Sequence, residues 1–181
     1  KPVLPMALLA LGAVLEGEHD YQIVDGNVED DPLDALEGAL RKSEADILGV
    51  TVMGGPQLHH AIPHSRQLKE AHPELTIVWG GYFPTQHYKI CLRAEYVDYV
   101  IRGHGEHVFK QFLDAWSNGE DPAANAGVAY RDAATGKIAA NERASLPNPD
   151  DLPWFPYHRV EMPRYLRSTF LGERTISHHS S

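Results

Sequence analysis

Three apolar runs that each end at glycine constrain this sequence more than any other feature. Asp46–Gly55 and Leu75–Gly81 end in paired glycines, and Tyr96–Glu106 ends in Gly-x-Gly-Glu. Apolar, β-branched runs bounded by turn residues are typical of buried strands in a parallel sheet. We expect Asp46–Gly55 to hold the central strand. The three glycine tips should meet at one edge of the sheet, where glycine lets one large flat ligand approach the backbone.

The rest of the first part of the chain alternates in the same way. A short strand is expected at Tyr21–Asp25, and helices are expected at Pro5–Gly17, Pro32–Lys42, Pro56–His72, Thr85–Glu95 and Glu106–Asn118. Strands that alternate with amphipathic helices predict an α/β fold, a doubly wound parallel sheet of the flavodoxin-like or Rossmann-like kind. We assign residues 1–120 to this domain.

The character of the sequence changes after residue 120. Gly127–Tyr130 and Lys137–Ala140 flank a short turn and predict a surface β-hairpin. Leu146–Pro163 is rich in proline and aromatic residues, which predicts a linker laid along a surface without regular structure. We assign 121–164 to the hairpin and linker, with Trp154, Phe155 and Tyr157 docked on the domain. Residues 165–181 are expected to be the truncated start of a further domain.

The opening of the chain is unusual for this pattern, because a helix precedes the first strand. In a sheet of order 2-1-3-4-5, the strand that lies between Tyr21–Asp25 and Asp46–Val52 would be the missing first strand. A buried strand does not leave its backbone unpaired. We therefore expect the chain to be a fragment that lacks residues at both ends, with a vacancy beside Asp46–Val52.

Composition narrows the possible partners. The chain has 181 residues with 16 basic and 25 acidic side chains, a formal charge of −9, which disfavours nucleic acid and anionic membranes as partners. No apolar run approaches the roughly 20 residues of a membrane span. The one cysteine, Cys91, excludes a disulfide within the chain and suits a reducing cytoplasm. One thiol also leaves this chain alone unable to ligate an iron–sulfur cluster.

Four stretches, taken in order, resemble a known family. They are Tyr-Gln-Ile-Val-Asp, Ala-Asp-Ile-Leu-Gly-Val-Thr, Ile-Val-Trp-Gly-Gly and Val-Ile-Arg-Gly-x-Gly-Glu. Together they resemble the cobalamin-binding domain of cobalamin-dependent radical SAM enzymes, over roughly Pro5 to Asn118. In that family a segment like Arg174–Ser181 leads into a Cys-x-x-x-Cys-x-x-Cys motif. The resemblance therefore implies cobalamin as cofactor here, with S-adenosylmethionine and a 4Fe–4S cluster only in the missing domain.

The resemblance also implies a set of cofactor-binding residues. They follow the strands, and they are Asp25, Asn27, Thr51, Met53, Gly54, Gly55, Pro56, Gln57, Gly80, Gly81, Tyr82, Phe83, Thr85, Arg102, Gly103, His104, Gly105 and Glu106. Two positions depart from the family, since Phe83 and His104 stand where many relatives carry histidine and glutamate. The Asp-x-His-x-x-Gly motif of many cobalamin carriers is absent from the sequence, so ligation of the lower face of cobalt stays open.

Two functions remain after this reading. The first is the cobalamin module of a radical SAM enzyme that transfers a methyl group or assists a rearrangement or ring closure, with a small-molecule or peptide substrate bound by the missing domain. The second is a stand-alone corrinoid carrier or a flavodoxin-like FMN-binding domain. No catalytic or metal-ligating residue is assigned to this chain. His59, His60 and His64 are read as a solvated helix face, and Cys91 as a buried, inert thiol.

Overall fold

The computed structural model describes residues 2–146 and 148–176. The described residues fall into two compact units. The first unit consists of the two ends of the chain, up to Ser43 and from Leu152 onward, and the second unit is Glu44–Asp151. The division into domains at residues 120 and 165 stays a prediction.

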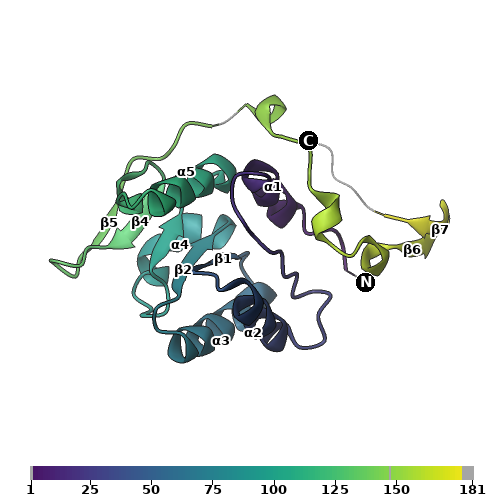
Figure 1. Cartoon of the computed structure of the whole chain (residues 1–181), viewed down its shortest axis with the longest axis horizontal. Coiled ribbons are helices and arrows are strands. Elements are labelled where there is room, and N and C mark those ends of the chain that lie inside the picture. Colours follow the sequence, from purple (N-terminus) through teal and green to yellow (C-terminus); the bar gives the residue numbers. More distant parts are fainter. Residues whose placement is uncertain (1, 147, 177–181) are drawn as a thin grey trace. The chain divides into compact units, whose positions relative to one another are not determined.

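The second unit is built on one five-stranded sheet (Figure 1). Strands β1 (Ile47–Thr51), β2 (Thr76–Gly80) and β3 (Tyr99–Ile101) are parallel, and β4 (Val128–Arg131) and β5 (Ile138–Ala140) continue the sheet in antiparallel pairing. The order in the sheet is β1-β2-β3-β4-β5. The α/β fold and the parallel pairing of the three glycine-tipped strands are confirmed.

Two helices connect the parallel strands, and a third follows β3 and leads towards β4; together they cover both faces of the sheet. They are α3 (Pro56–Ala71), α4 (Tyr82–Cys91) and α5 (Gly105–Ser117). Val78 on β2 packs with residues of α5, whereas the indole of the next residue, Trp79, donates a hydrogen bond of 3.1 Å to Ser65 on α3. Because successive side chains of a strand point to opposite faces, α3 and α5 lie on opposite faces of the sheet.

Gly49 explains how closely α5 approaches β1. A Cβ atom at this position would lie 3.0 Å from Cζ of Phe109, so the missing side chain makes room for the ring of Phe109 on α5. One core cluster of this unit consists of Val78, Ile101, Val108, Phe112 and Val128. The apolar side of α5 that the sequence predicts is thus packed on the sheet.

The predicted hairpin is part of the sheet rather than an appendage on its surface. Val128 pairs with Ile101, which places β4 directly beside β3. The guanidinium of Arg131 on β4 donates hydrogen bonds to the carbonyls of Leu92 and Ala94, just beyond α4. An isolated hairpin is at best marginally stable in water, and this one gains its stability from the sheet that it extends.

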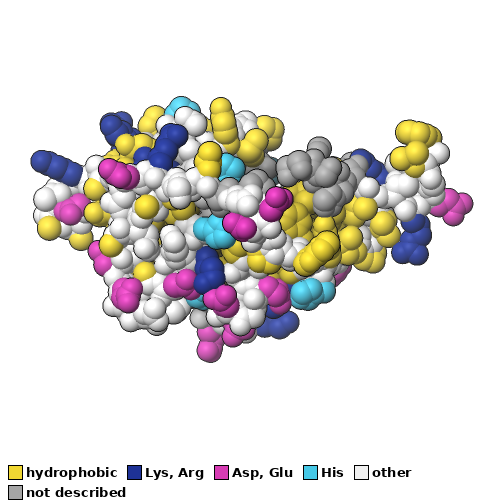
Figure 2. All heavy atoms as spheres, turned by 90° about the horizontal axis from the view of Figure 1, so that it is seen from above, with side chains coloured by type: hydrophobic (Ala, Val, Ile, Leu, Met, Phe, Trp, Pro, Cys, Tyr) yellow, Lys and Arg dark blue, Asp and Glu magenta, His cyan; other side chains and the backbone are white. Residues whose placement is uncertain are grey.

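The first unit contains α1 (Met6–Leu15) and α2 (Pro32–Ser43), followed after the other unit by short 3-10 turns at Tyr157–Arg159 and Met162–Tyr165. The chain then forms a two-stranded hairpin, β6 (Arg167–Thr169) and β7 (Gly172–Thr175). Leu4, Leu9 and Tyr165 are the buried centre of the unit, packed by side chains from both ends of the chain. Figure 2 shows hydrophobic side chains that stand out from the β6–β7 hairpin, whose turn exposes Phe170 and Leu171.

Two strand predictions are wrong. Tyr21–Asp25 forms no strand, because no described strand pairs with its backbone. Ile47–Thr51 is an edge strand of the described sheet rather than a central one. An apolar run indicates that both faces of a strand are buried, but it does not indicate which strand pairs with its edge. Within the described residues, nothing pairs with the other edge of β1.

Three further expectations are answered by the structure. The helix expected at Thr85–Glu95 begins earlier, at Tyr82, and ends at Cys91. Trp154 is almost fully exposed and is not docked, whereas Phe155 and Tyr157 pack against the buried centre of the first unit. The predicted strand at Thr175–Ser177 lies partly outside the described residues, and β7 ends at Thr175. None of the described helices combines the length and apolar character needed to cross a membrane.

Candidate functional site at the glycine tips

The three glycine tips lie at the carboxyl ends of three neighbouring parallel strands, and so at one edge of the sheet. The first two tips are joined by backbone hydrogen bonds, since Val52 N–H donates to the carbonyl of Gly80 (2.8 Å) and Phe83 N–H donates to the carbonyl of Val52 (3.1 Å). The residues assigned to this edge from sequence are Thr51, Met53, Gly54, Gly55, Pro56, Gln57, Gly80, Gly81, Tyr82, Phe83, Thr85, Arg102, Gly103, His104, Gly105 and Glu106.

Several of these glycines face open space. A Cβ atom at Gly55 or Gly103 would meet nothing within 4 Å, and one at Gly54 would meet only Cδ2 of Phe83, at 4.0 Å. The side chains beside them are large and exposed, with 52% of Met53 and 67% of Tyr82 accessible to solvent. Exposed apolar side chains next to uncovered backbone are typical of a surface that binds a ligand.

Gly81 differs from these positions. Its φ is +95°, and a Cβ atom would lie 3.0 Å from the carbonyl oxygen of Val52 and 3.1 Å from both the nitrogen of Val52 and Oγ1 of Thr51. The glycine is therefore required by the β1 tip itself, which leaves no room for a side chain.

We expect Gly81→Ala to lower the free energy of unfolding by about 2–4 kcal/mol, because the backbone is strained and the contacts are with main-chain atoms. Urea denaturation followed by circular dichroism measures this change. Gly80→Ala is the matched control, since its Cβ atom would make only ordinary contacts, the nearest 3.8 Å from Cβ of Ile101. Equal stability of the two variants would contradict the assignment.

Two polar side chains predicted to contact a cofactor hold the tips in place. Oε1 of Gln57 accepts a hydrogen bond of 2.8 Å from Met53 N–H, which fixes the loop after β1. The hydroxyl of Thr85 donates to the carbonyl of Gly81 (2.7 Å) and accepts from Gly103 N–H (3.0 Å). Their direct contact with a cofactor stays a prediction.

The third tip contains a buried arginine. Arg102 is 8% exposed, its guanidinium carbon lies 5.0 Å from the centre of the Tyr88 ring, and its Nη2 donates to the carbonyl of Asn141. His104 precedes α5 and is exposed, and Glu106 lies in the first turn of the helix. Within the described residues, Nε of Arg102 and Oε2 of Glu106 are buried polar atoms with no hydrogen-bond partner. Buried polar atoms in proteins are normally hydrogen-bonded, so we expect a ligand or a water molecule to bond to these two atoms.

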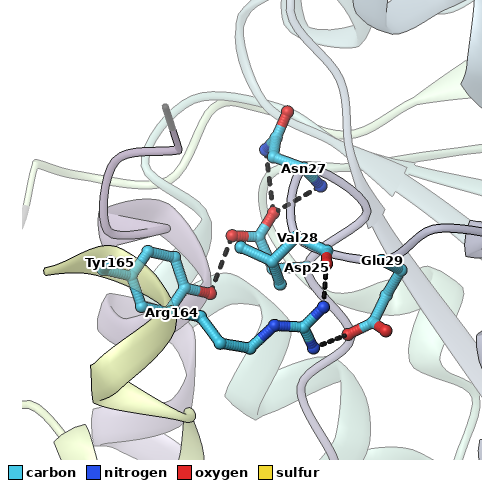
Figure 3. Close-up of polar contacts among 6 residues, drawn as sticks. All are labelled: Asp25, Asn27, Val28, Glu29, Arg164 and Tyr165. Atoms are coloured by element: carbon cyan, nitrogen blue, oxygen red, sulfur yellow. Dashed lines mark hydrogen bonds and ion pairs between the residues drawn. The ribbon is translucent and has the colours of Figure 1, made fainter. Parts of the chain in front are cut away.

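Asp25 and Asn27 belong to the first unit, where Asp25 has a structural role (Figure 3). The carboxylate is 5% exposed and accepts hydrogen bonds from the backbone and side-chain nitrogens of Asn27, at 3.0 and 2.8 Å, and from the hydroxyl of Tyr165, at 2.9 Å. Beside it, Arg164 donates to the carboxylate of Glu29 (2.8 Å) and to the carbonyl of Val28. Burial, with the hydrogen bond to Asp25, raises the pKa of Tyr165 well above its usual value. We call Asp25, Glu29, Arg164 and Tyr165 the clasp.

Sequence reasoning assigned Asp25 and Asn27 to the cofactor and gave Arg164 and Tyr165 no role. Nothing in the local pattern marks a tyrosine as the partner of a carboxylate 140 residues away. The clasp residues also line a pocket of about 170 Å³, which is smaller than the roughly 300 Å³ at which small-molecule sites begin. This pocket is too small for a cofactor of the size that the glycine tips suggest.

The remaining candidates do not form a site in the described part of the chain. His59, His60 and His64 lie on α3, and no group of three or more metal-binding side chains is found among the described residues. Cys91 is buried, and this burial raises the pKa of its thiol to about 11, which makes it a poor nucleophile at neutral pH.

Comparison with known proteins gives a consistent picture. Residues 2–113 match the family model described as B12 binding domain. The chain is 29% identical over 164 residues to an uncharacterized methyltransferase from Pyrococcus horikoshii, covering 89% of this chain and 35% of that protein. It is 31% identical over 132 residues to the anaerobic magnesium-protoporphyrin IX monomethyl ester cyclase of Synechocystis sp., covering 70% of this chain and 26% of the cyclase. This chain therefore spans between about a quarter and a third of these relatives.

Solved structures share the fold. The cobalamin-dependent S-adenosylmethionine radical enzyme OxsB, with aqua-cobalamin and S-adenosylmethionine bound, superposes with a TM-score of 0.65 at 18% identity, over 80% of this chain and 20% of that one. The radical S-adenosylmethionine methyltransferase TsrM from Kitasatospora setae, with cobalamin and a 4Fe–4S cluster bound, also gives 0.65 at 18% identity, over 97% of this chain and 34% of that one.

Proposed function

This chain belongs to the B12-binding domain family, and from that premise we propose that its three glycine tips hold the corrin ring and nucleotide tail of cobalamin. The observation that carries the proposal is the open space over Gly54, Gly55 and Gly103 at one edge of a parallel sheet. A wide, flat ligand needs close backbone approach over a broad area, which glycine permits.

The side chains at this edge fit such a ligand. Met53 and Tyr82 offer exposed apolar surface to the ring. The unpartnered Oε2 of Glu106 is an acceptor that suits an amide N–H, a group that corrinoids carry around the ring. Gln57 and Thr85 keep the loops in place, so that little order has to be imposed when the ligand binds.

For the whole protein we propose a cobalamin-dependent radical SAM enzyme that carries out methyl transfer, a rearrangement or a ring closure. The support is that its relatives include proteins named as a methyltransferase and as a cyclase. When bound, cobalamin supplies a cobalt centre able to carry a methyl group or take part in radical chemistry. S-adenosylmethionine and a 4Fe–4S cluster would be bound by residues other than these. We further propose a small-molecule or peptide substrate, no nucleic-acid or membrane partner, and the cytoplasm as the compartment.

Titration of hydroxocobalamin into the intact protein tests the proposal. Binding is expected to change the visible absorbance spectrum of the corrinoid and to saturate at one molecule per chain. FMN is titrated in parallel, followed by quenching of its fluorescence. Binding of FMN without binding of the corrinoid would overturn the proposal and favour a flavodoxin-like module.

A further inference from the structure

The second and third glycine tips are joined by a single side chain. Gly103 N–H donates to the hydroxyl of Thr85 at 3.0 Å, and the same hydroxyl donates to the carbonyl of Gly81 at 2.7 Å. Through these two hydrogen bonds the hydroxyl links one tip to the other, since Gly81 follows β2 and Gly103 follows β3. A hydroxyl can do both because it has one donor and two acceptor sites.

The neighbouring turn of the same helix contacts the same tip. Thr85 and Tyr88 both lie on α4, with the non-helical backbone of His87 between them. The Tyr88 ring lies under the guanidinium of Arg102, the residue before Gly103. Arg102 is in turn held by its backbone, whose N–H donates to the carbonyl of Gly127 at 2.9 Å. The position of Arg102 is thus fixed by buried contacts, whereas Gly103 is exposed and depends on Thr85.

We propose that Thr85 is a positioning residue for the cofactor, whose hydroxyl fixes the separation of the second and third tips. This inference rests on the proposed function, because it assigns Thr85 a role in the same site. It differs from the assignment made from sequence, in which the hydroxyl contacts the cofactor. The hydroxyl uses its one donor on Gly81 and one of its two acceptor sites on Gly103, so the role that we assign to Thr85 acts through these two residues.

The test compares Thr85→Val with Thr85→Ser in the intact protein. Valine has the shape of threonine without the hydroxyl, and serine keeps the hydroxyl. We expect Thr85→Val to weaken binding of hydroxocobalamin about tenfold, the loss expected when the hydrogen bond that holds the loop at Gly103 is removed. Thr85→Ser should stay within about twofold of the parent protein. Thr135→Val, in the turn before β5, is a control for loss of a threonine hydroxyl far from the tips.

Amide hydrogen exchange separates this inference from the proposed function. In the protein without ligand, exchange at Gly103 should speed up in Thr85→Val and not in Thr85→Ser, because only valine removes the acceptor. If the parent protein fails to bind hydroxocobalamin, the proposed function fails, and the cofactor role of Thr85 fails with it. This holds even if faster exchange at Gly103 shows that Thr85 holds the third tip. If the parent binds and Thr85→Val binds equally well, or if serine fails to restore binding, the inference alone is overturned.

Discussion

Replacing Gly54 by tryptophan is expected to weaken binding of hydroxocobalamin to the intact protein by more than about 100-fold, since a side chain in the volume of the ligand acts as a steric block. Gly54 suits this test because its backbone does not need glycine. Its φ is not in the left-handed region, and a Cβ atom would meet only Phe83, at 4.0 Å. The indole should therefore enter the open space above the tips and leave the fold intact. Visible absorbance titration measures the loss of affinity.

Gly38→Trp is the matched control. Gly38 lies on α2, and a Cβ atom there would also meet nothing within 4 Å. Its affinity for hydroxocobalamin should equal that of the parent protein. Circular dichroism and melting temperature confirm that both variants are folded. Unchanged affinity in a folded Gly54→Trp protein would remove the cofactor from this edge of the sheet.

Removal of the Asp25 carboxylate is expected to lower the stability of the first unit substantially. Asp25→Ala should lower the free energy of unfolding by about 3 kcal/mol, because it leaves the buried hydroxyl of Tyr165 without an acceptor and removes two hydrogen bonds to Asn27. Tyr165 is only 3% exposed, whereas Asn27 is exposed, so its nitrogens can bond to water instead. Tyr165→Phe should cost less, about 1–2 kcal/mol, since the carboxylate keeps its bonds to Asn27. Urea denaturation followed by circular dichroism gives both values.

A double-mutant cycle shows whether the two residues act through each other. The combined variant should be less destabilised than the sum of the single changes, with a coupling of about 1–2 kcal/mol. Asp30→Ala, an exposed carboxylate in the same loop, is the control and should change stability by less than about 0.5 kcal/mol. Strictly additive effects of Asp25→Ala and Tyr165→Phe would contradict the clasp.

The sequence was sufficient to predict the features that depend on local pattern. The apolar runs ending at Gly55, Gly81 and Gly105 identify parallel strands and the edge at which their tips meet, because strand burial and glycine turns leave a mark in consecutive residues. The same reasoning found both strands of the hairpin. It missed that Val128 pairs with Ile101, because pairing between strands is a property of the fold and leaves no local pattern.

Long-range polar contacts were the part of the site that sequence could not give. The sequence around Asp25 fits a ligand contact and a turn equally well. Only the fold shows that the carboxylate of Asp25 accepts a hydrogen bond from the hydroxyl of Tyr165. Thr85 was predicted to contact the cofactor, but the sequence could not show that its hydroxyl bonds to residues of two different loops. Gly81 was predicted to contact the ligand, and the structure adds that it makes room for the backbone of Val52.

The clasp has a consequence for the order in which the chain is made. A ribosome releases α1 and Asp25 early, but their cover, including Tyr165, emerges only after the entire second unit has been synthesised. The second unit is continuous in sequence and can fold first, since domains fold as units during synthesis. Until residue 165 has left the ribosome, Leu4 and Leu9 lack part of their native packing, and the Asp25 carboxylate lacks the hydroxyl of Tyr165. An interrupted chain would therefore expose apolar surface of the kind that chaperones and proteases recognise.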